Sequence, residues 1–245
     1  MDTLNAQEGE LTGYHCVKCK NKGFTAVLRD DGSFFVRECS CMPMRKCVRQ
    51  MESSGLSKTI KNKTFDSFLA TEPWQNTLKE AVMQYAKQPE GWLMISGQPG
   101  SGKTHLCTAV CREILLRGES LLYMPWREYI GKLKALNMEP SERFALLDKC
   151  KNSPWLYIDD LFKTGKNQEN RAIPSATDIN LAFEILNHRY CQQLSTILST
   201  EKTPGELMKI DEALASRIME CCGTNLYSIA SGEEKNYRLR NITCL

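Results

Sequence analysis

The sequence has no long hydrophobic run. None of its apolar stretches approaches the roughly 20 residues that cross a bilayer as a helix, and residues 1–5 are polar rather than the apolar core of a secretory signal. Internal repeats and low-complexity tracts are absent as well. These absences argue against a membrane, secreted or repeat protein, so we expect a cytoplasmic globular protein with no membrane partner.

The sequence also has little excess charge. Its net charge is +3 at pH 7, with 42% hydrophobic and 25% charged residues, which is ordinary for a globular protein. So small a charge does not by itself indicate nucleic-acid binding. Between Met42 and Thr64, however, six Lys or Arg residues are accompanied by a single acid, Glu52. Such a cluster is compatible with a surface that follows a phosphate backbone, although a solvated linker is the commoner interpretation.

Cysteine, by contrast, is abundant, with twelve in the chain. In a long sequence without a secretion signal, reduced thiols or metal ligands are favoured over disulfides. Two short-spaced pairs, Cys16 with Cys19 and Cys39 with Cys41, flank an alternating segment with an Asp-Asp-Gly turn at residues 30–32. The alternation predicts a β-hairpin of residues 24–28 and 33–37, which would bring the two pairs together.

Four thiolates held in this way suit a structural, tetrahedral Zn²⁺ site in a unit too small to have a core of its own. The single residue between Cys39 and Cys41 is a tighter spacing than usual. Cys47 and His15 therefore stay open as alternative ligands. Residues 1–50 are expected to form this zinc-binding module.

The rest of the chain divides into a polar connection, residues 51–70, and a larger domain, residues 71–245. A helix is expected from Thr71 to about Lys87, with proline in its first turn. Five short apolar strands then alternate with helical patterns, at residues 92–96, 120–124, 154–159, 195–199 and 226–229. This alternation predicts an α/β fold with a mostly parallel five-stranded sheet covered by helices.

A complete phosphate-binding loop spans Gly97 to Thr104, between the strand at residues 92–96 and a helix at residues 104–116. Glycines let the backbone N–H groups turn toward an anion, and the N-terminus of the helix favours phosphate. Lys103 is expected to reach the β- and γ-phosphates of ATP, and the Thr104 hydroxyl to bind Mg²⁺. The predicted nucleotide-binding residues are Gly97, Pro99, Gly100, Ser101, Gly102, Lys103, Thr104 and His105.

The second part of such a site is an acid at the end of a neighbouring strand. Four apolar residues at 155–158 are followed by Asp159 and Asp160. We expect Asp159 to hold Mg²⁺ at the carboxyl edge of the sheet and Asp160 to activate the attacking water. An acid pair that only ends a core strand is the alternative, which the phosphate loop upstream makes less favourable.

With these motifs, nearly the whole chain resembles bacterial and prophage helicase loaders of the DnaC/DnaI type, within the AAA+ ATPases and close to the transposition helper IstB. The resemblance rests on the cysteine module, the lead-in at residues 63–68, the two nucleotide motifs, and the segments 196–201 and 211–218. It implies an AAA+ fold, hydrolysis of ATP to ADP and phosphate, and self-association through the ATP site. It further implies that the zinc module binds a replicative DnaB-type helicase, which the protein places on single-stranded DNA.

Three further positions follow from the resemblance. A γ-phosphate sensor is expected at Ser199, Thr200 or Glu201, and we favour Thr200. Arg217 matches the arginine finger that such proteins offer to the neighbouring subunit, although the sequence alone favours a solvated helix flank. The resemblance assigns no role to the arginines at residues 238 and 240.

Two other functions are alternatives to helicase loading. An IstB-like ATPase would regulate a transposase on DNA, but the cysteine module favours a loader. A metabolic P-loop kinase would need an acceptor pocket and an arginine-rich lid, and the sequence shows neither pattern.

Overall fold

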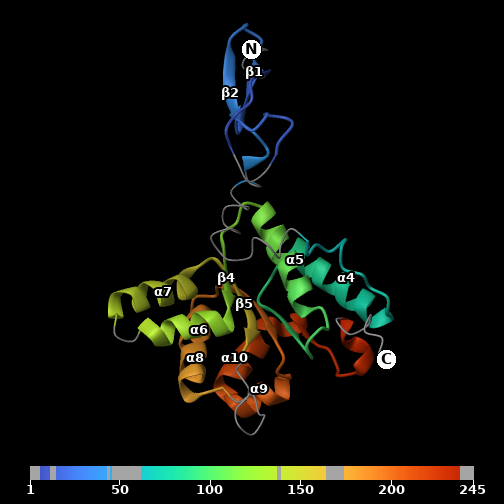
Figure 1. Ribbon diagram of the computed structural model, residues 1–245, viewed down its shortest axis with the longest axis vertical. Helices are drawn as coiled ribbons and strands as arrows, with labels where there is room; N and C mark the ends of the chain where they lie inside the picture. The colour runs from blue at the N-terminus through green and yellow to red at the C-terminus, as the bar shows by residue number, and fades with distance from the viewer. Residues whose placement is uncertain are drawn as a thin grey trace, which may run out of the picture.

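A computed structural model describes residues 6–11, 15–42, 45, 62–136, 139–163 and 174–237. The N-terminal unit is built on an antiparallel hairpin of β1 (Phe24–Leu28) and β2 (Phe34–Glu38), as Figure 1 shows. In its turn, Asp31 accepts hydrogen bonds from the amide and hydroxyl of Ser33. Gly32 has a φ of 81°, the left-handed conformation that glycine adopts freely. The predicted hairpin is therefore confirmed, one residue later in its second strand.

The larger domain contains a five-stranded parallel sheet with the order β4-β5-β6-β3-β7. This confirms the predicted fold. The strands are β3 (Leu93–Ser96), β4 (Leu121–Pro125), β5 (Trp155–Leu161), β6 (Ser195–Thr200) and β7 (Leu226–Ser228). The helices are α4 (Pro73–Lys87), α5 (Lys103–Leu116), α6 (Trp126–Ala135), α7 (Pro140–Asn152), α8 (Ala176–Cys191), α9 (Pro204–Ile210) and α10 (Glu212–Cys222).

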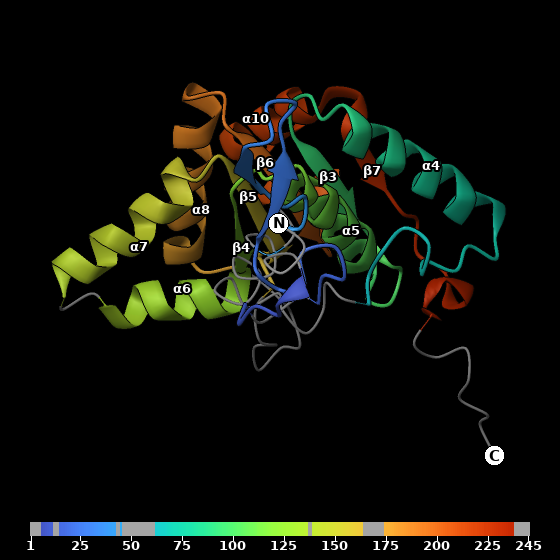
Figure 2. The ribbon, with the colours of Figure 1, turned by 90° about the horizontal axis from the view of Figure 1, so that it is seen from above.

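Helices cover both faces of the sheet (Figure 2). Alternate residues of each strand pack in opposite directions, so that Leu93 and Ile95 lie in the core beneath α4 and α5, and Met94 lies in the core shared with α6 to α10. Strands buried on both faces need continuous apolar sequence, which is what the strand segments have. Strand β6 lies between β5 and β3. The carboxyl ends of these three strands therefore meet at one edge.

Arg189, on α8, connects the end of α7 to the start of β6. Its side chain is fully buried, and its guanidinium donates to the carbonyl oxygens of Cys150 at 3.2 Å, Lys151 at 3.1 Å, Ser153 at 2.8 Å and Ser195 at 2.5 Å. Burial lowers the pKa of this guanidinium to about 10, so it stays charged at neutral pH. It thus satisfies carbonyls at the end of α7 that have no partner within the helix.

Replacing Arg189 with Met should destabilise the domain by about 3 to 5 kcal/mol, because several buried carbonyls would lose their donor. Chemical denaturation followed by circular dichroism measures this change. Arg112→Met is the matched control, since Arg112 forms only a partly exposed ion pair with Glu113 on α5. Its effect should stay within about 0.5 kcal/mol. Equal stabilities of the two variants would contradict this role of Arg189.

Candidate functional site

The loop between β3 and α5 has the backbone geometry of an anion cradle. Gly100 has a φ of 80° and Gly102 a φ of 92°, and Gly102 caps the N-terminus of α5. A Cβ at Gly102 would lie 2.7 Å from the Phe68 ring, and one at Gly100 would lie 2.0 Å from the side chain of Asn236. Only glycine fits these positions, so backbone N–H groups can line the loop where side chains would block a phosphate.

Lys103 begins α5 and is almost fully buried. Its ammonium donates to the carbonyl oxygens of Gly97 at 2.7 Å and Gln98 at 2.9 Å. Burial lowers the pKa of Lys103, while the negative charges of Asp160 and Glu201 act in the opposite direction. The loop thus keeps a cation at its centre, where a polyphosphate would offer it better acceptors.

Asp159 is a buried residue of β5 and lies next to the loop. One carboxylate oxygen accepts from the hydroxyls of Thr104 at 3.1 Å, Tyr157 at 2.7 Å and Ser199 at 2.5 Å. The other accepts from Tyr123 at 2.9 Å. The predicted partners Thr104 and Asp159 are therefore in direct contact. The oxygen atoms of a hydroxyl and a neighbouring carboxylate are the kind of ligands that Mg²⁺ prefers.

A β-bulge in β5 changes the direction of the backbone at Asp160. Ile158 pairs with Leu198 and Leu161 with Thr200, so β5 has one residue more than β6 over this stretch. Asp160 has a φ of 59°, and its amide donates to the Ser199 hydroxyl at 2.9 Å. Bulges commonly redirect side chains near active sites. Here the bulge turns Asp160 into the pocket while Asp159 stays beneath it.

Lys163 connects Asp160 to Glu201, and neither contact was predicted. Its ammonium lies 2.7 Å from Asp160 Oδ2 and 2.9 Å from Glu201 Oε1. Burial lowers the pKa of Lys163, but the hydrogen bonds to the two carboxylates outweigh burial and raise it. The only sequence signal was a lysine three residues after the acid pair.

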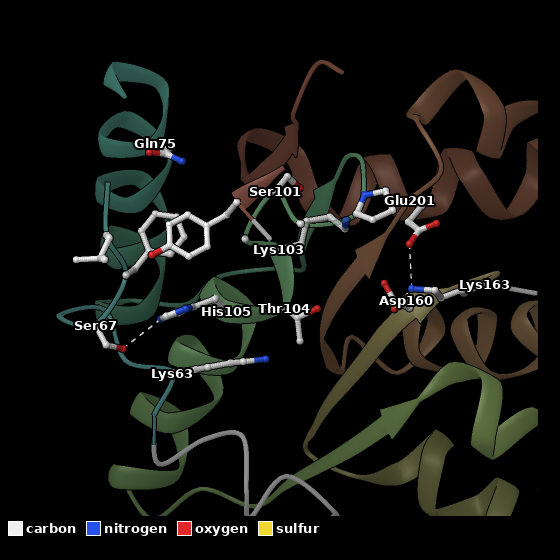
Figure 3. A pocket seen from close by; sticks show the side chains of 16 residues that line it. Lys63, Ser67, Gln75, Ser101, Lys103, Thr104, His105, Asp160, Lys163 and Glu201 are labelled. Carbon is white, nitrogen blue, oxygen red and sulfur yellow. Dashed lines mark hydrogen bonds and ion pairs between the residues drawn. The ribbon is translucent and has the colours of Figure 1, made fainter. Parts of the chain in front are cut away.

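These groups line a cavity of about 360 Å³ (Figure 3). Lys103, Asp160, Lys163 and Glu201 lie toward one end of it, and Ser67 and Gln75 toward the other. The second end is built from segments far away in the sequence, and the amide of Tyr237 donates to the Gly100 carbonyl at 3.1 Å. The lining residues that sequence analysis missed are Lys63, Ser67, Phe68, Leu69, Gln75, Lys163 and Tyr237.

His105 lines the same cavity but is held by the lead-in segment. Its Nε2 lies 2.8 Å from the Thr64 carbonyl and 3.3 Å from the Ser67 hydroxyl, and its ring meets Phe68 edge to face. A hydrogen bond to a carbonyl requires the proton on Nε2. Burial lowers the pKa of His105, and the bond to Thr64 opposes this. Its contacts thus join the first turn of α5 to the lead-in.

Of the predicted sensor and finger residues, Glu201 lines the cavity, whereas Ser199, Thr200 and Arg217 are not part of the lining. The hydroxyl of buried Thr200 donates to the Leu161 carbonyl at 2.8 Å and accepts from the Lys202 amide at 3.1 Å. Ser199 contacts both acids, as described above, and Glu201 pairs with Lys163 in the cavity lining. Arg217 on α10 lies over the rings of Phe183 and Tyr190, at 5.4 and 5.6 Å, away from this pocket. The arginines at 238 and 240 lie outside the described residues.

The four predicted cysteines form a buried cluster in the N-terminal unit. Their sulfur atoms all lie within 4.8 Å of one another, with Cys16 and Cys39 at 3.8 Å and Cys19 and Cys41 at 3.5 Å. Burial raises the pKa of Cys19, but the Gly23 amide and the neighbouring thiols outweigh it and lower the value to about 6. Four converging thiols, one of them easily ionised, fit a tetrahedral Zn²⁺.

The alternative ligands do not join this cluster within the described part of the chain. His15 is exposed, and its Nδ1 pairs with the Asn21 side chain at 3.2 Å. Cys47 lies outside the described residues. The set that converges is therefore the two predicted pairs.

A glycine cradle with a central lysine, and a hydroxyl–carboxylate pair at the end of the adjacent strand, define the class as P-loop ATPases of the AAA+ type. A family model described as the bacterial DnaA ATPase domain matches residues 60–224. The chain belongs to this DnaA/DnaC family of AAA+ ATPases. In the helices of the described ranges, no stretch is long and apolar enough to cross a membrane.

Individual relatives agree with this assignment. The chain is 33% identical to the phage-like element PBSX protein XkdC of Bacillus subtilis, over 96% of this chain and 90% of that protein. It is 29% identical to the replicative helicase loader DnaC of Escherichia coli K12, over 71% of this chain and 69% of that protein. A crystal structure of the DnaC helicase loader superposes with a TM-score of 0.61 at 24% identity, over 71% of this chain and 99% of that one, and supports the fold.

Proposed function

We propose that the protein is an ATP-dependent loader of a replicative DnaB-type helicase onto single-stranded DNA. The observation that carries this proposal is the similarity to the replicative helicase loader DnaC, which extends over 71% of this chain. Membership of the DnaA/DnaC family, whose named relatives act in DNA replication, supports the same function. The site residues supply the ATPase that such a loader needs.

In the proposed reaction, Lys103 leaves the loop carbonyls and binds the β- and γ-phosphates. Thr104 and Asp159 would hold Mg²⁺, which would neutralise charge on the phosphates. Asp160 accepts the proton of a water molecule whose oxygen attacks the γ-phosphorus, and ADP leaves. The hydroxyls on Asp159 fix its carboxylate, so only modest reorganisation is needed for metal binding.

Residues that lie outside the pocket of their own chain have proposed roles in assembly. Arg217 is half-buried on α10, and we propose that it acts on the nucleotide of a neighbouring subunit. The site would then be complete only in an oligomer. Thr200 remains a proposed sensor, which would have to give up its bond to Leu161 to reach a phosphate.

Residues 1–50 are proposed to bind the helicase, residues 51–70 to connect, and residues 71–245 to bind ATP and self-associate. On one face of the hairpin, Leu28, Phe34 and Val36 are 56%, 56% and 55% exposed. Paired register places Leu28 opposite Phe34 and Ala26 opposite Val36, so these side chains share that face. An apolar face this exposed supports a protein-binding role for the module.

In a binding assay with the replicative helicase of the same organism, the purified chain should co-elute with the helicase when ATP is present. It should also increase the amount of helicase retained on circular single-stranded DNA. A transposase with its DNA serves as the parallel arm, because an IstB-like regulator would bind that instead.

Phe34→Ser, on the exposed face, should weaken helicase binding while ATP turnover is retained. Absence of helicase binding with and without ATP would exclude the loader function.

A further inference from the structure

Lys163 forms a bridge between the ends of two strands at the phosphate end of the pocket. It contacts Asp160, at the bulge of β5, and Glu201, directly after β6 (Figure 3). The side chains of Lys163, Asp160 and Glu201 are 42%, 29% and 31% exposed. All three also line the cavity.

A bridge this exposed contributes little to the stability of a fold. Its local effect is larger, because Asp160 and Glu201 are like charges that face a cavity suited to a polyphosphate. Without an ammonium between them, the two carboxylates would repel each other and turn apart. The Lys163 amide also donates to the Asp160 carbonyl at 2.9 Å, which closes a turn and fixes the lysine relative to the acid.

The backbone conformation of Asp160 makes the contact with Lys163 more important. Its φ of 59° is a left-handed conformation that is unfavourable for a non-glycine residue. The Ser199 hydroxyl fixes the Asp160 amide at 2.9 Å, but it leaves the carboxylate free to rotate. The hydrogen bond to Asp160 Oδ2 that holds the carboxylate comes from Lys163.

We propose that Lys163 is a positioning residue of the ATPase, which aims the Asp160 carboxylate at the attacking water while Glu201 anchors the lysine. This rests on the proposed role of Asp160 as the base. In the reaction, the water proton goes to Asp160, the water oxygen bonds to the γ-phosphorus, and the bond from that phosphorus to the leaving ADP oxygen breaks. Lys163 exchanges no proton. When Asp160 becomes neutral, the ammonium remains held by Glu201.

Lys163→Met should lower kcat for ATP by at least about tenfold and change KM by less than about threefold, because orientation rather than substrate binding is lost. Lys163→Arg should restore most of kcat, since a guanidinium can reach both carboxylates. Lys202→Met is the matched control, because it removes a positive charge beside Glu201 without removing a residue that lines the cavity. Its kcat should stay within about twofold of the unmodified chain.

The bridge itself can be measured without turnover, by acetylation of lysines in the nucleotide-free protein followed by mass spectrometry. Glu201→Gln should accelerate the reaction of Lys163, because it removes one of the two carboxylates that hold the ammonium. The proposal is overturned if Lys163→Met leaves kcat unchanged. It is also overturned if Glu201→Gln leaves the acetylation rate of Lys163 unchanged. If the protein hydrolyses ATP but binds no helicase, only the proposed loader function is contradicted. A chain that hydrolyses no ATP overturns both.

Discussion

Asp160→Asn should leave ATP binding nearly intact and lower the turnover of ATP by about 10² to 10⁴-fold. Asparagine has the same shape and keeps an oxygen that can accept the hydrogen bond from Lys163. Its amide cannot accept the proton of the attacking water. Binding should survive because the groups that hold the phosphates and Mg²⁺, Lys103, Thr104 and Asp159, are unchanged.

Phosphate release under saturating ATP measures the turnover, and titration with a fluorescent ATP analogue measures the affinity. Asp148→Asn is the control, since Asp148 is an exposed acid on α7 that accepts from the Asn152 side chain and is not among the residues that line the cavity. That variant should turn over ATP like the unmodified chain. Turnover retained in Asp160→Asn would place the base elsewhere and would also remove the reason for positioning by Lys163.

The features that could be predicted from sequence are those in which contiguous residues determine the geometry. Glycines within the loop, a lysine that begins a helix, and two acids after four apolar residues each fix a local structure. The strand order brings them together, because β6 lies between β5 and β3. The contact of Thr104 with Asp159 follows from this topology.

Contacts that depend on an irregularity could not be predicted in the same way. The pairing of Lys163 with Glu201 requires the β5 bulge, and no residue in that stretch indicates that the backbone of Asp160 adopts a positive φ. The part of the pocket lined by Phe68 and Tyr237 could not be predicted either, because these residues come from segments far apart in the sequence. Those contacts result from tertiary packing, which short-range patterns do not encode.

The cysteine cluster is a case in which spacing sufficed, because a hairpin with a pair at each base allows few arrangements. Cys16 and Cys19 come before β1, and Cys39 and Cys41 follow β2. The register of the two strands then brings the pairs to the same end of the hairpin. The described parts of this unit bury few large apolar side chains besides the thiols. The cluster must therefore supply most of its stability.

Removal of zinc should accordingly unfold the N-terminal unit and leave the ATPase domain folded. Structural Zn²⁺ sites of this kind contribute about 10 to 16 kcal/mol of apparent binding free energy, far more than a small hairpin gains from its own contacts. The purified chain should contain one zinc per molecule by atomic absorption. Treatment with a strong chelator should release it and collapse the dispersed amide NMR signals of the hairpin, such as those of Val27 and Phe35.

The same loss should follow from Cys39→Ser, which removes one thiolate of the four and leaves a hydroxyl that binds zinc poorly. Cys191→Ser is the matched control, because Cys191 is an exposed thiol at the end of α8. That variant should keep its zinc. In the chelated protein and in Cys39→Ser, ATP affinity should remain, since the phosphate loop lies in a separately packed core, whereas helicase binding should disappear with the hairpin. A hairpin that stays folded in metal-free, reducing buffer would contradict a structural role for zinc and would mean that the thiols pack as an apolar core.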